Sequence, residues 1–216
     1  MTPVSDHRAE DDDVPIRVDF REAATARAWI EDTRIRRPYR ARFFTAFCEA
    51  LQQLAKPLRI LELGSGPGQL AREILVHCQT QRYVALNFSP AMHEIALEHL
   101  GELANRVTFQ TRDFREPAWP ERLGPFDAVV TLQAAHETRH KRHLIPLLER
   151  ARTVLAQGGV LLYADHYLTP ATKIPALAPT KADQKLALER AGFGGVQLRY
   201  EEGNMALWLG TNGAVP

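Results

Sequence analysis

Three residues near the middle of the chain have the spacing of a metal site. His136, Glu137 and His140 form the pattern H-E-x-x-H within the stretch AAHETRHKRH. On a helix this spacing puts both imidazoles on one face, where they can bind zinc while the glutamate acts as a base. The extended pattern fails, because His143 occupies the glycine position and Pro146 the position of a third histidine. We therefore expect no metal site here, and a zinc hydrolase stays an alternative that predicts bound zinc.

A glycine-rich loop is the second group with chemical potential. Gly64, Gly66 and Gly68 follow the apolar run LRILEL and precede a helical pattern. Glycines at such a junction allow positive φ angles and let a ligand lie against the main chain, close to free amide donors. The dinucleotide pattern G-x-G-x-x-G would need a glycine where Gln69 stands. A nicotinamide-dependent oxidoreductase is therefore a disfavoured alternative.

The elements that must position these residues alternate between strands and helices. The predicted strands cover residues 58–64, 82–88, 106–112, 126–133 and 159–165, and the predicted helices cover 69–77, 90–100, 143–155 and 180–193. This alternation is typical of a doubly wound, mostly parallel α/β sheet with helices on both faces. Two last apolar runs, GVQLRYE and NMALWLG, are joined by EGN and predict a closing antiparallel hairpin.

Composition excludes several classes of partner. The chain has 27 Lys and Arg against 26 Asp and Glu, so it has no basic field for nucleic acid or anionic membranes. Its longest apolar runs fall far short of the roughly 20 residues that span a bilayer. The polar, acidic residues 1–18 predict a disordered tail and do not form a secretory signal. The only two cysteines, Cys48 and Cys78, favour reduced thiols and a cytoplasmic protein.

The glycine loop resembles motif I of the class I S-adenosylmethionine-dependent methyltransferases. The resemblance covers most of the chain from Leu58 onward, and the predicted hairpin matches the antiparallel seventh strand of that family. It implies a Rossmann-like fold and S-adenosyl-L-methionine as the cofactor, whose methionine part and ribose contact this loop. The loop positions are Glu62, Gly64, Ser65, Gly66 and Gly68.

The resemblance also implies cofactor contacts at the ends of the next two strands. The family usually has a carboxylate for the ribose hydroxyls at the tip of the second strand, where this chain has Asn87. An amide can accept from a hydroxyl but lacks the charge, a difference of roughly 1–2 kcal/mol. Phe88 is expected beside the adenine, Asp113 at its amino group, and Phe114 packed nearby.

In similar methyltransferases the loop after the fourth strand faces the cofactor's methyl group and the methyl acceptor. Gln133 is therefore expected to line the cofactor pocket, and His136 and Glu137 to orient or deprotonate the acceptor. An imidazole can act as a base near neutral pH because its reference pKa is about 6.5. The expected acceptor contacts are Tyr39, Arg40 and His166.

These observations predict one domain organisation and one activity. Residues 1–18 form the tail, 19–56 an N-terminal helical lid and 57–216 the cofactor-binding core. The protein is expected to move a methyl group to an O, N, S or C atom of a small molecule, mainly by positioning in a dry pocket. A non-catalytic binding or regulatory module with a weakened cofactor site is the alternative. The acceptor and the oligomeric state stay open.

Overall fold

Seven strands form one sheet in the computed structural model, which describes residues 12–16 and 18–213. The strand order is β3-β2-β1-β4-β5-β7-β6. β7 is antiparallel to β5 and β6, whereas the pairings among β1 to β5 are parallel. The strands are β1 (Leu58–Leu63), β2 (Thr80–Asn87), β3 (Val107–Thr111), β4 (Phe126–Leu132), β5 (Leu155–His166), β6 (Gly194–Glu202) and β7 (Met205–Thr211).

Within the described residues, six α-helices and four short 3-10 helices surround this sheet. The α-helices are α1 (Ala23–Arg36), α2 (Arg40–Gln52), α3 (Gln69–His77), α4 (Pro90–Leu100), α5 (Leu144–Thr153) and α6 (Lys181–Arg190). The 3-10 helices are η1 (Gly101–Arg106), η2 (Ala135–Thr138), η3 (Lys141–His143) and η4 (Pro175–Leu177). The predicted α/β fold, with its N-terminal helices and its closing hairpin, is confirmed. None of the described helices is both long enough and apolar enough to cross a membrane.

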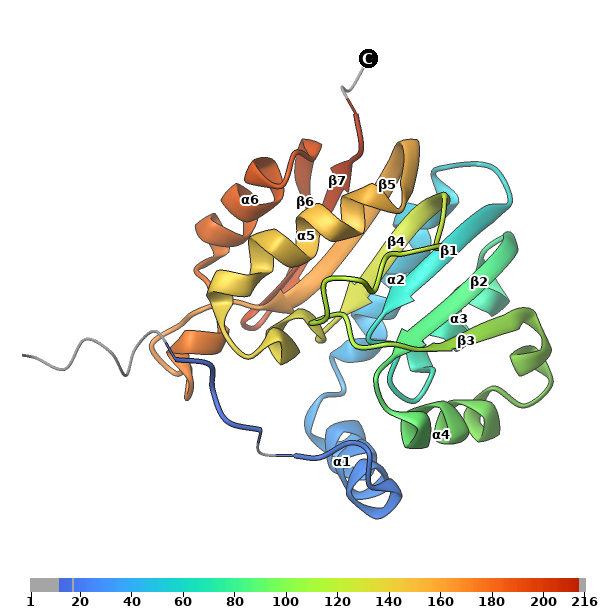
Figure 1. The fold of residues 1–216 in the computed structure, drawn as a ribbon, viewed down its shortest axis with the longest axis horizontal. Coiled ribbons are helices and arrows are strands. Elements are labelled where there is room, and N and C mark those ends of the chain that lie inside the picture. The colour runs from blue at the N-terminus through green and yellow to red at the C-terminus, as the bar shows by residue number, and fades with distance from the viewer. Residues whose placement is uncertain (1–11, 17, 214–216) are drawn as a thin grey trace, which may run out of the picture.

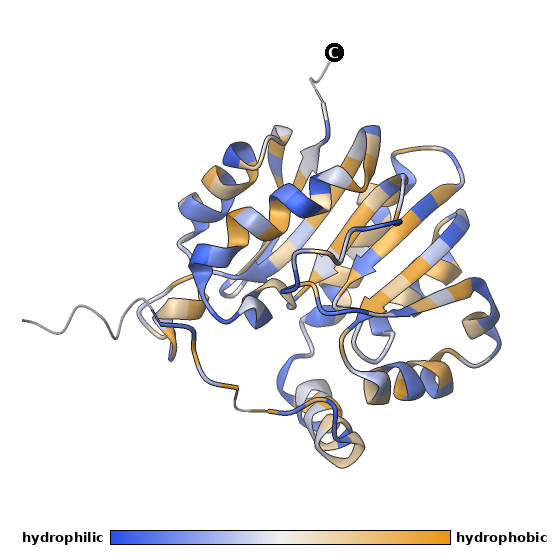
Figure 2. Cartoon of the chain, in the orientation of Figure 1, coloured by the Kyte–Doolittle hydropathy of each residue, from blue (hydrophilic) through white to orange (hydrophobic). Residues whose placement is uncertain are grey.

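Two apolar layers hold the helices against the sheet. On one face α2 contributes Phe43, Phe47 and Leu51 to a core shared with α3 and the strands. On the other face the buried residues of α5 and α6 form the second core, with Phe193 beside them. Figure 1 shows α5 and α6 in front of the strands and α2 and α3 behind them. The central strands are largely hydrophobic in Figure 2, as strands covered on both faces must be.

The connection between β3 and β4 is an exception to this layering. Residues 112–125 contain no helix or strand. The side chain of Trp119 is buried in the core on the α5 side, and Arg112 donates to the carbonyl oxygens of Trp119 and Glu121 at 2.8 Å each. This corner of the sheet is therefore covered by a loop.

α1 lies apart from both layers, beyond the carboxyl ends of the central strands (Figure 1). It packs on α4 through a small cluster of Ala26, Met92 and Ile95 together with Phe20. Arg27 and Glu98 add an ion pair of 2.7 Å between the two helices. α1 is thereby held over the edge of the sheet where parallel α/β folds bind ligands.

The segment before α1 contacts the loop that follows β4. Of the expected tail, residues 1–11 and 17 lie outside the described residues. The backbone amide of Val14 donates to the Arg139 carbonyl at 2.9 Å, and Arg139 Nε donates to the Val14 carbonyl at 2.8 Å. Asp13 accepts from Arg142 at 2.6 Å and lies 2.8 Å from His143 Nε2. This part of the chain runs along the loop that carries His136.

Candidate active site

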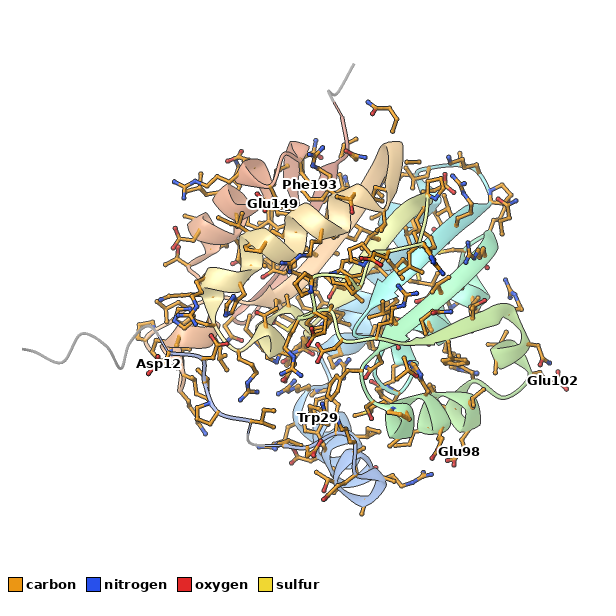
Figure 3. All side chains as sticks on the ribbon, viewed as in Figure 1. Asp12, Trp29, Glu98, Glu102, Glu149 and Phe193 are labelled. Atoms are coloured by element: carbon orange, nitrogen blue, oxygen red, sulfur yellow. The ribbon has the colours of Figure 1, made fainter. Side chains whose placement is uncertain are left out.

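A cavity that is partly open to solvent lies at the carboxyl edge of the sheet. It brings together residues that are far apart in the sequence, from the start of α1 to the loop after β4. Figure 3 shows Trp29 on the side of α1 that faces the sheet. The lining residues are Phe20, Trp29, Arg37, Gly64, Gly66, Asn87, Phe88, Met92, Phe114, Gln133, Ala134, His136 and Glu137.

The three glycines of the loop have different structural roles. A Cβ on Gly64 would lie 2.3 Å from the Cβ of Ala134, so this glycine allows two loops to touch. A Cβ on Gly66 would meet nothing nearer than 4.0 Å, which leaves its main chain open toward the cavity. Gly68 does not line the cavity; its Cβ would lie 3.2 Å from Ala96, so it lets α3 approach α4. All three have positive φ angles, between 51° and 76°, which favour glycine.

Glu62 and Ser65 lie beneath the loop and do not line the cavity. Burial raises the pKa of Glu62 to about 8, although the hydroxyl of Tyr83, which donates to it at 2.7 Å, acts in the opposite direction. The Ser65 hydroxyl is buried and has no hydrogen-bond partner among the described residues. Arg40 also lies outside the cavity lining; its guanidinium lies over the ring of Phe44 at 5.7 Å, and burial lowers its pKa to about 10.

The tip of β2 is ordered by Asn87. Its Oδ1 accepts from the backbone amide of Ser89 at 2.9 Å, which leaves the amide hydrogens for a ligand. Ser89 caps α4 by accepting from the Met92 amide at 3.1 Å. Asn87 therefore enters the cavity in a fixed orientation.

Phe88 and Asp113 border a second, smaller cavity beside the first one. The guanidinium of Arg115 lies 5.8 Å from the centre of the Phe88 ring, and that of Arg21 lies 5.2 Å from it. Asp113 accepts from the Arg115 backbone amide at 2.9 Å and from its Nε at 2.9 Å. Burial would raise the pKa of Asp113, but these contacts outweigh it and lower the pKa. Asp113 is thus an ionised carboxylate paired with an arginine.

His136 is held by two carboxylates. Its Nδ1 lies 2.9 Å from Asp165 Oδ1, and its backbone amide donates to Asp165 Oδ2 at 3.0 Å. Its Nε2 lies 3.5 Å from Glu137 Oε1. Asp165 is buried, whereas the His136 side chain keeps 24% of its surface exposed. The ring is therefore fixed at Nδ1 and accessible at the cavity wall.

These carboxylates set the charge of His136. Burial alone would lower its pKa, but Asp165 and Glu137 outweigh burial and raise the pKa of His136 to about 10. The pKa of Asp165 is lowered, against the effect of its burial, by the same partner. At neutral pH His136 is an imidazolium, which donates hydrogen bonds and has no lone pair to take a proton. The neutral base expected from the reference pKa is not the state that this environment favours.

A second hydrogen-bonded group joins Gln133 to His166 and Tyr39. Gln133 Nε2 lies 2.8 Å from His166 Nε2 and 3.4 Å from the Tyr39 hydroxyl. His166 Nδ1 in turn lies 3.1 Å from Asn204 Oδ1, and burial lowers the His166 pKa. Gln133 Oε1 is buried without a partner among the described residues. Of these residues only Gln133 lines the cavity. His166 and Tyr39 lie behind it and contact the lining through the Gln133 side chain.

The H-E-x-x-H residues do not share a helical face. His136 lies in η2 and His140 just before η3, and Arg139 between them has a left-handed backbone with φ 75°. His140 is buried, and its Nδ1 accepts from the Arg142 amide at 3.1 Å. Within residues 12–16 and 18–213, no group of three or more His, Cys, Asp or Glu side chains could hold a metal ion.

Several residues of the site were missed by sequence reasoning. Asp165 is the most important, and its position beside His166 at the end of a predicted strand was the available signal. Arg37, Trp29 and Phe20 line the cavity, but the short distance between α1 and the sheet edge has no signature in the sequence. Sequence patterns place residues on elements and give no account of how two distant elements dock.

The comparisons with known proteins agree with this architecture. Residues 60–159 match the family model described as "Methyltransferase domain". The highly reducing polyketide synthase easB of Emericella nidulans is 31% identical over 125 residues, which cover 53% of this chain and 5% of that synthase. Highly reducing polyketide synthase 40 of Fusarium mangiferae is 30% identical over 118 residues, again 5% of the synthase. The chain thus matches only a small part of these relatives.

Solved structures share the fold at low identity. An O-methyltransferase family protein from Burkholderia thailandensis has a TM-score of 0.72 and 19% identity, over 91% of this chain and 62% of that one. Human N-acetylserotonin methyltransferase, solved with S-adenosylmethionine, has a TM-score of 0.64 and 18% identity, over 90% and 57% of the two chains. The CurJ carbon methyltransferase has a TM-score of 0.63 and 18% identity, over 73% and 49%. Residues 60–159 thus match a methyltransferase domain, and the strand order agrees with the resemblance of this chain to the class I S-adenosylmethionine-dependent methyltransferases.

Proposed function

We propose that the protein binds S-adenosyl-L-methionine in the cavity and transfers its methyl group to an O, N, S or C atom of a small molecule. One observation supports this most strongly: the open main chain at Gly66 and the carboxylate-bound His136 line the same cavity. The similar proteins include O-methyltransferase family members and a carbon methyltransferase. They support a small-molecule acceptor and leave its reacting atom open.

The residues present fit the cofactor. Gly66 lets a ligand lie against the backbone, and Gln133 Oε1, which has no partner among the described residues, offers an acceptor for an ammonium group. Asn87 would meet the ribose, while Phe88 and Phe114 would flank the adenine. Arg115 contacts both carboxylate oxygens of Asp113, so Asp113 would reach the adenine amino group only by sharing an oxygen with Arg115. When bound, the cofactor supplies a methyl group on a positively charged sulfur.

The chain itself would contribute enclosure and orientation. Phe20 and Trp29 contact each other edge to face, with ring centres 5.1 Å apart, and cover the cavity from the α1 side. We therefore assign the role of a lid to α1 and the segment before it, whereas α2 belongs to the core. The enclosed cavity would exclude water, and the fixed ring of His136 would hold the acceptor in line with the methyl group. As part of the same proposal, the buried free thiols Cys48 and Cys78 fit a cytoplasmic protein.

Titration calorimetry with S-adenosylhomocysteine tests this function. We expect micromolar binding of S-adenosylhomocysteine and S-adenosylmethionine, no binding of NAD, and no zinc in the same sample. The absence of binding to protein that circular dichroism shows to be folded would contradict the proposal and favour a non-catalytic module. Stoichiometric zinc would favour the hydrolase alternative.

A further inference from the structure

We propose that the methyl acceptor is a small anion that enters the cavity already deprotonated and is held between the guanidinium of Arg37 and the imidazole of His136. This inference rests on the proposed function and adds the charge class of its second substrate. The arrangement of charges around the cavity supports this inference.

Arg37 is a cation that has no counter-ion among the described residues. It directly follows α1, is partly buried and lines the cavity. Its guanidinium lies 6.0 Å from the centre of the Trp29 ring. Among residues 12–16 and 18–213 it forms no ion pair within 4.0 Å. A partly buried charge at an apolar wall is unfavourable until an opposite charge reaches it.

The other charges of the cavity already match one another. Glu137 lies 3.3 Å from Arg139 Nη1, and Asp165 lies 2.9 Å from His136 Nδ1. Arg37 is the charged residue of the cavity lining that belongs to neither pair. The cofactor carries a sulfonium, an ammonium and a carboxylate, so it adds a further positive charge whichever residue meets its carboxylate. The loaded cavity is therefore positive, and an anionic acceptor would neutralise it.

His136 is arranged to donate to such an anion. Asp165 occupies Nδ1, while Nε2 has only a long contact of 3.5 Å with Glu137. The raised pKa of His136, about 10, keeps a hydrogen on Nε2 at neutral pH. The imidazolium can stabilise a negative acceptor atom but cannot remove its proton. A neutral alcohol would therefore find no base in this pair.

The chemistry balances without a base. The acceptor anion forms a bond to the methyl carbon, the bond from that carbon to sulfur breaks, and its electron pair stays on sulfur. Two opposite charges disappear and no proton is released. The acceptors that fit are mostly apolar molecules with one anionic group, such as a carboxylate, an acidic enol or an acidic phenol, because Phe20, Trp29 and Met92 supply the rest of the wall.

A pair of dyes tests the charge preference without knowledge of the natural acceptor. The probes are 4-nitrophenol, titrated at a pH at which it is ionised, and 4-nitroaniline, which has a similar size and no charge. Both are titrated into protein saturated with S-adenosylhomocysteine. The variants are Arg37→Met, His136→Gln and, as the matched control, Arg42→Met on α2, which pairs with Glu202 outside the cavity.

We expect the wild type and Arg42→Met to bind the phenolate about tenfold more tightly than the aniline, and we expect Arg37→Met and His136→Gln each to lose most of that ratio. Equal binding of the dyes, or no binding of the phenolate, in protein that binds S-adenosylhomocysteine would overturn the inference. It would also fall if Arg37→Met weakened S-adenosylhomocysteine and left the dye ratio unchanged, since Arg37 would then serve the cofactor's carboxylate. Loss of S-adenosylhomocysteine binding in the wild type would instead contradict the proposed function.

Discussion

Both carboxylate oxygens of Asp165 contact His136: Oδ1 lies 2.9 Å from the ring Nδ1, and Oδ2 accepts from the backbone amide at 3.0 Å. One buried side chain therefore fixes the ring, its charge and the loop that carries it. This pair joins the end of β5 to the loop after β4, which lines the cavity through His136.

Replacing the Asp165 carboxylate with an amide should remove its negative charge and keep its shape. In Asp165→Asn the amide keeps a similar size but no longer balances the imidazolium, so we expect the pKa of His136 to fall toward its reference value. Breaking a buried pair typically costs about 3–5 kcal/mol of unfolding free energy. NMR titration of the histidine rings and urea denaturation measure the two effects. An unchanged titration of His136 would show that Asp165 does not set its charge.

The same pair makes stability depend on pH. In the unfolded chain His136 titrates near pH 6.5, at its reference value. In the fold its pKa is raised to about 10, so the stabilisation is complete below the unfolded pKa and is lost as pH rises toward the folded one. We expect the unfolding free energy to decrease between about pH 7 and 10. His136→Gln should flatten this decrease, and an equally steep decrease in that variant would assign it to other groups.

Gly66→Ala should affect the cofactor more than the fold. The φ of Gly66 is 51°, so a side chain costs roughly 1–2 kcal/mol of stability and would project toward the cavity. Gly203→Ala is the control, since Gly203 has a φ of 60° in the β6–β7 turn and open space around it. We expect similar losses in thermal stability and at least about a tenfold loss of S-adenosylhomocysteine affinity only in Gly66→Ala. Equal affinities would place the cofactor away from this backbone.

Asn87→Asp should strengthen cofactor binding. The carboxylate would still accept from the Ser89 amide and would add charged acceptors for the ribose hydroxyls. A gain of roughly 1 kcal/mol, the usual difference between charged and neutral hydrogen bonds, corresponds to about a fivefold tighter complex with S-adenosylhomocysteine. Calorimetry would measure it, with adenine as a ligand that lacks ribose and should not respond. A weaker complex would mean that the amide hydrogens of Asn87 contact the ribose.

Asp127 offers a variant that should change stability alone. It accepts from Lys56 Nζ at 2.8 Å and from both Nε and the backbone amide of Arg59 at 2.9 Å, at the amino ends of β1 and β4. Arg59 foremost lowers its pKa, so its stabilisation exists above the unfolded pKa and is lost on acidification. Asp127→Asn should cost roughly 1–2 kcal/mol, chiefly near neutral pH, because Lys56 and Arg59 can reach solvent, and leave S-adenosylhomocysteine affinity unchanged. A loss of affinity would reveal coupling across the sheet.

Much of the fold could be predicted because local patterns decide it. Helices α3 and α4 occupy the predicted residues 69–77 and 90–100, since a glycine loop begins one and a Ser-Pro cap begins the other. The strands were visible as apolar runs between turn residues. The alternation of these elements left few possible topologies.

The site was less predictable because it depends on long-range contacts. The H-E-x-x-H spacing gave no sign of the left-handed Arg139 that prevents a helix. The raised pKa of His136 needs Asp165, which lies 29 positions along the chain. Side-chain charge states follow from the tertiary structure, so residue types alone suggested a neutral base.

The corner of the sheet that is covered by a loop, without a helix, has a dynamic consequence. β4 is buried along its whole length, whereas β3 is an edge strand of partly exposed residues next to the loop of residues 112–125. Amide hydrogens of β3 should therefore exchange with solvent through local opening, and those of β1 and β4 only through global unfolding. Because Asp113 and Phe114 follow β3 directly, the part of the protein nearest the proposed adenine site is also the part most able to open, and exchange rates there would report ligand binding.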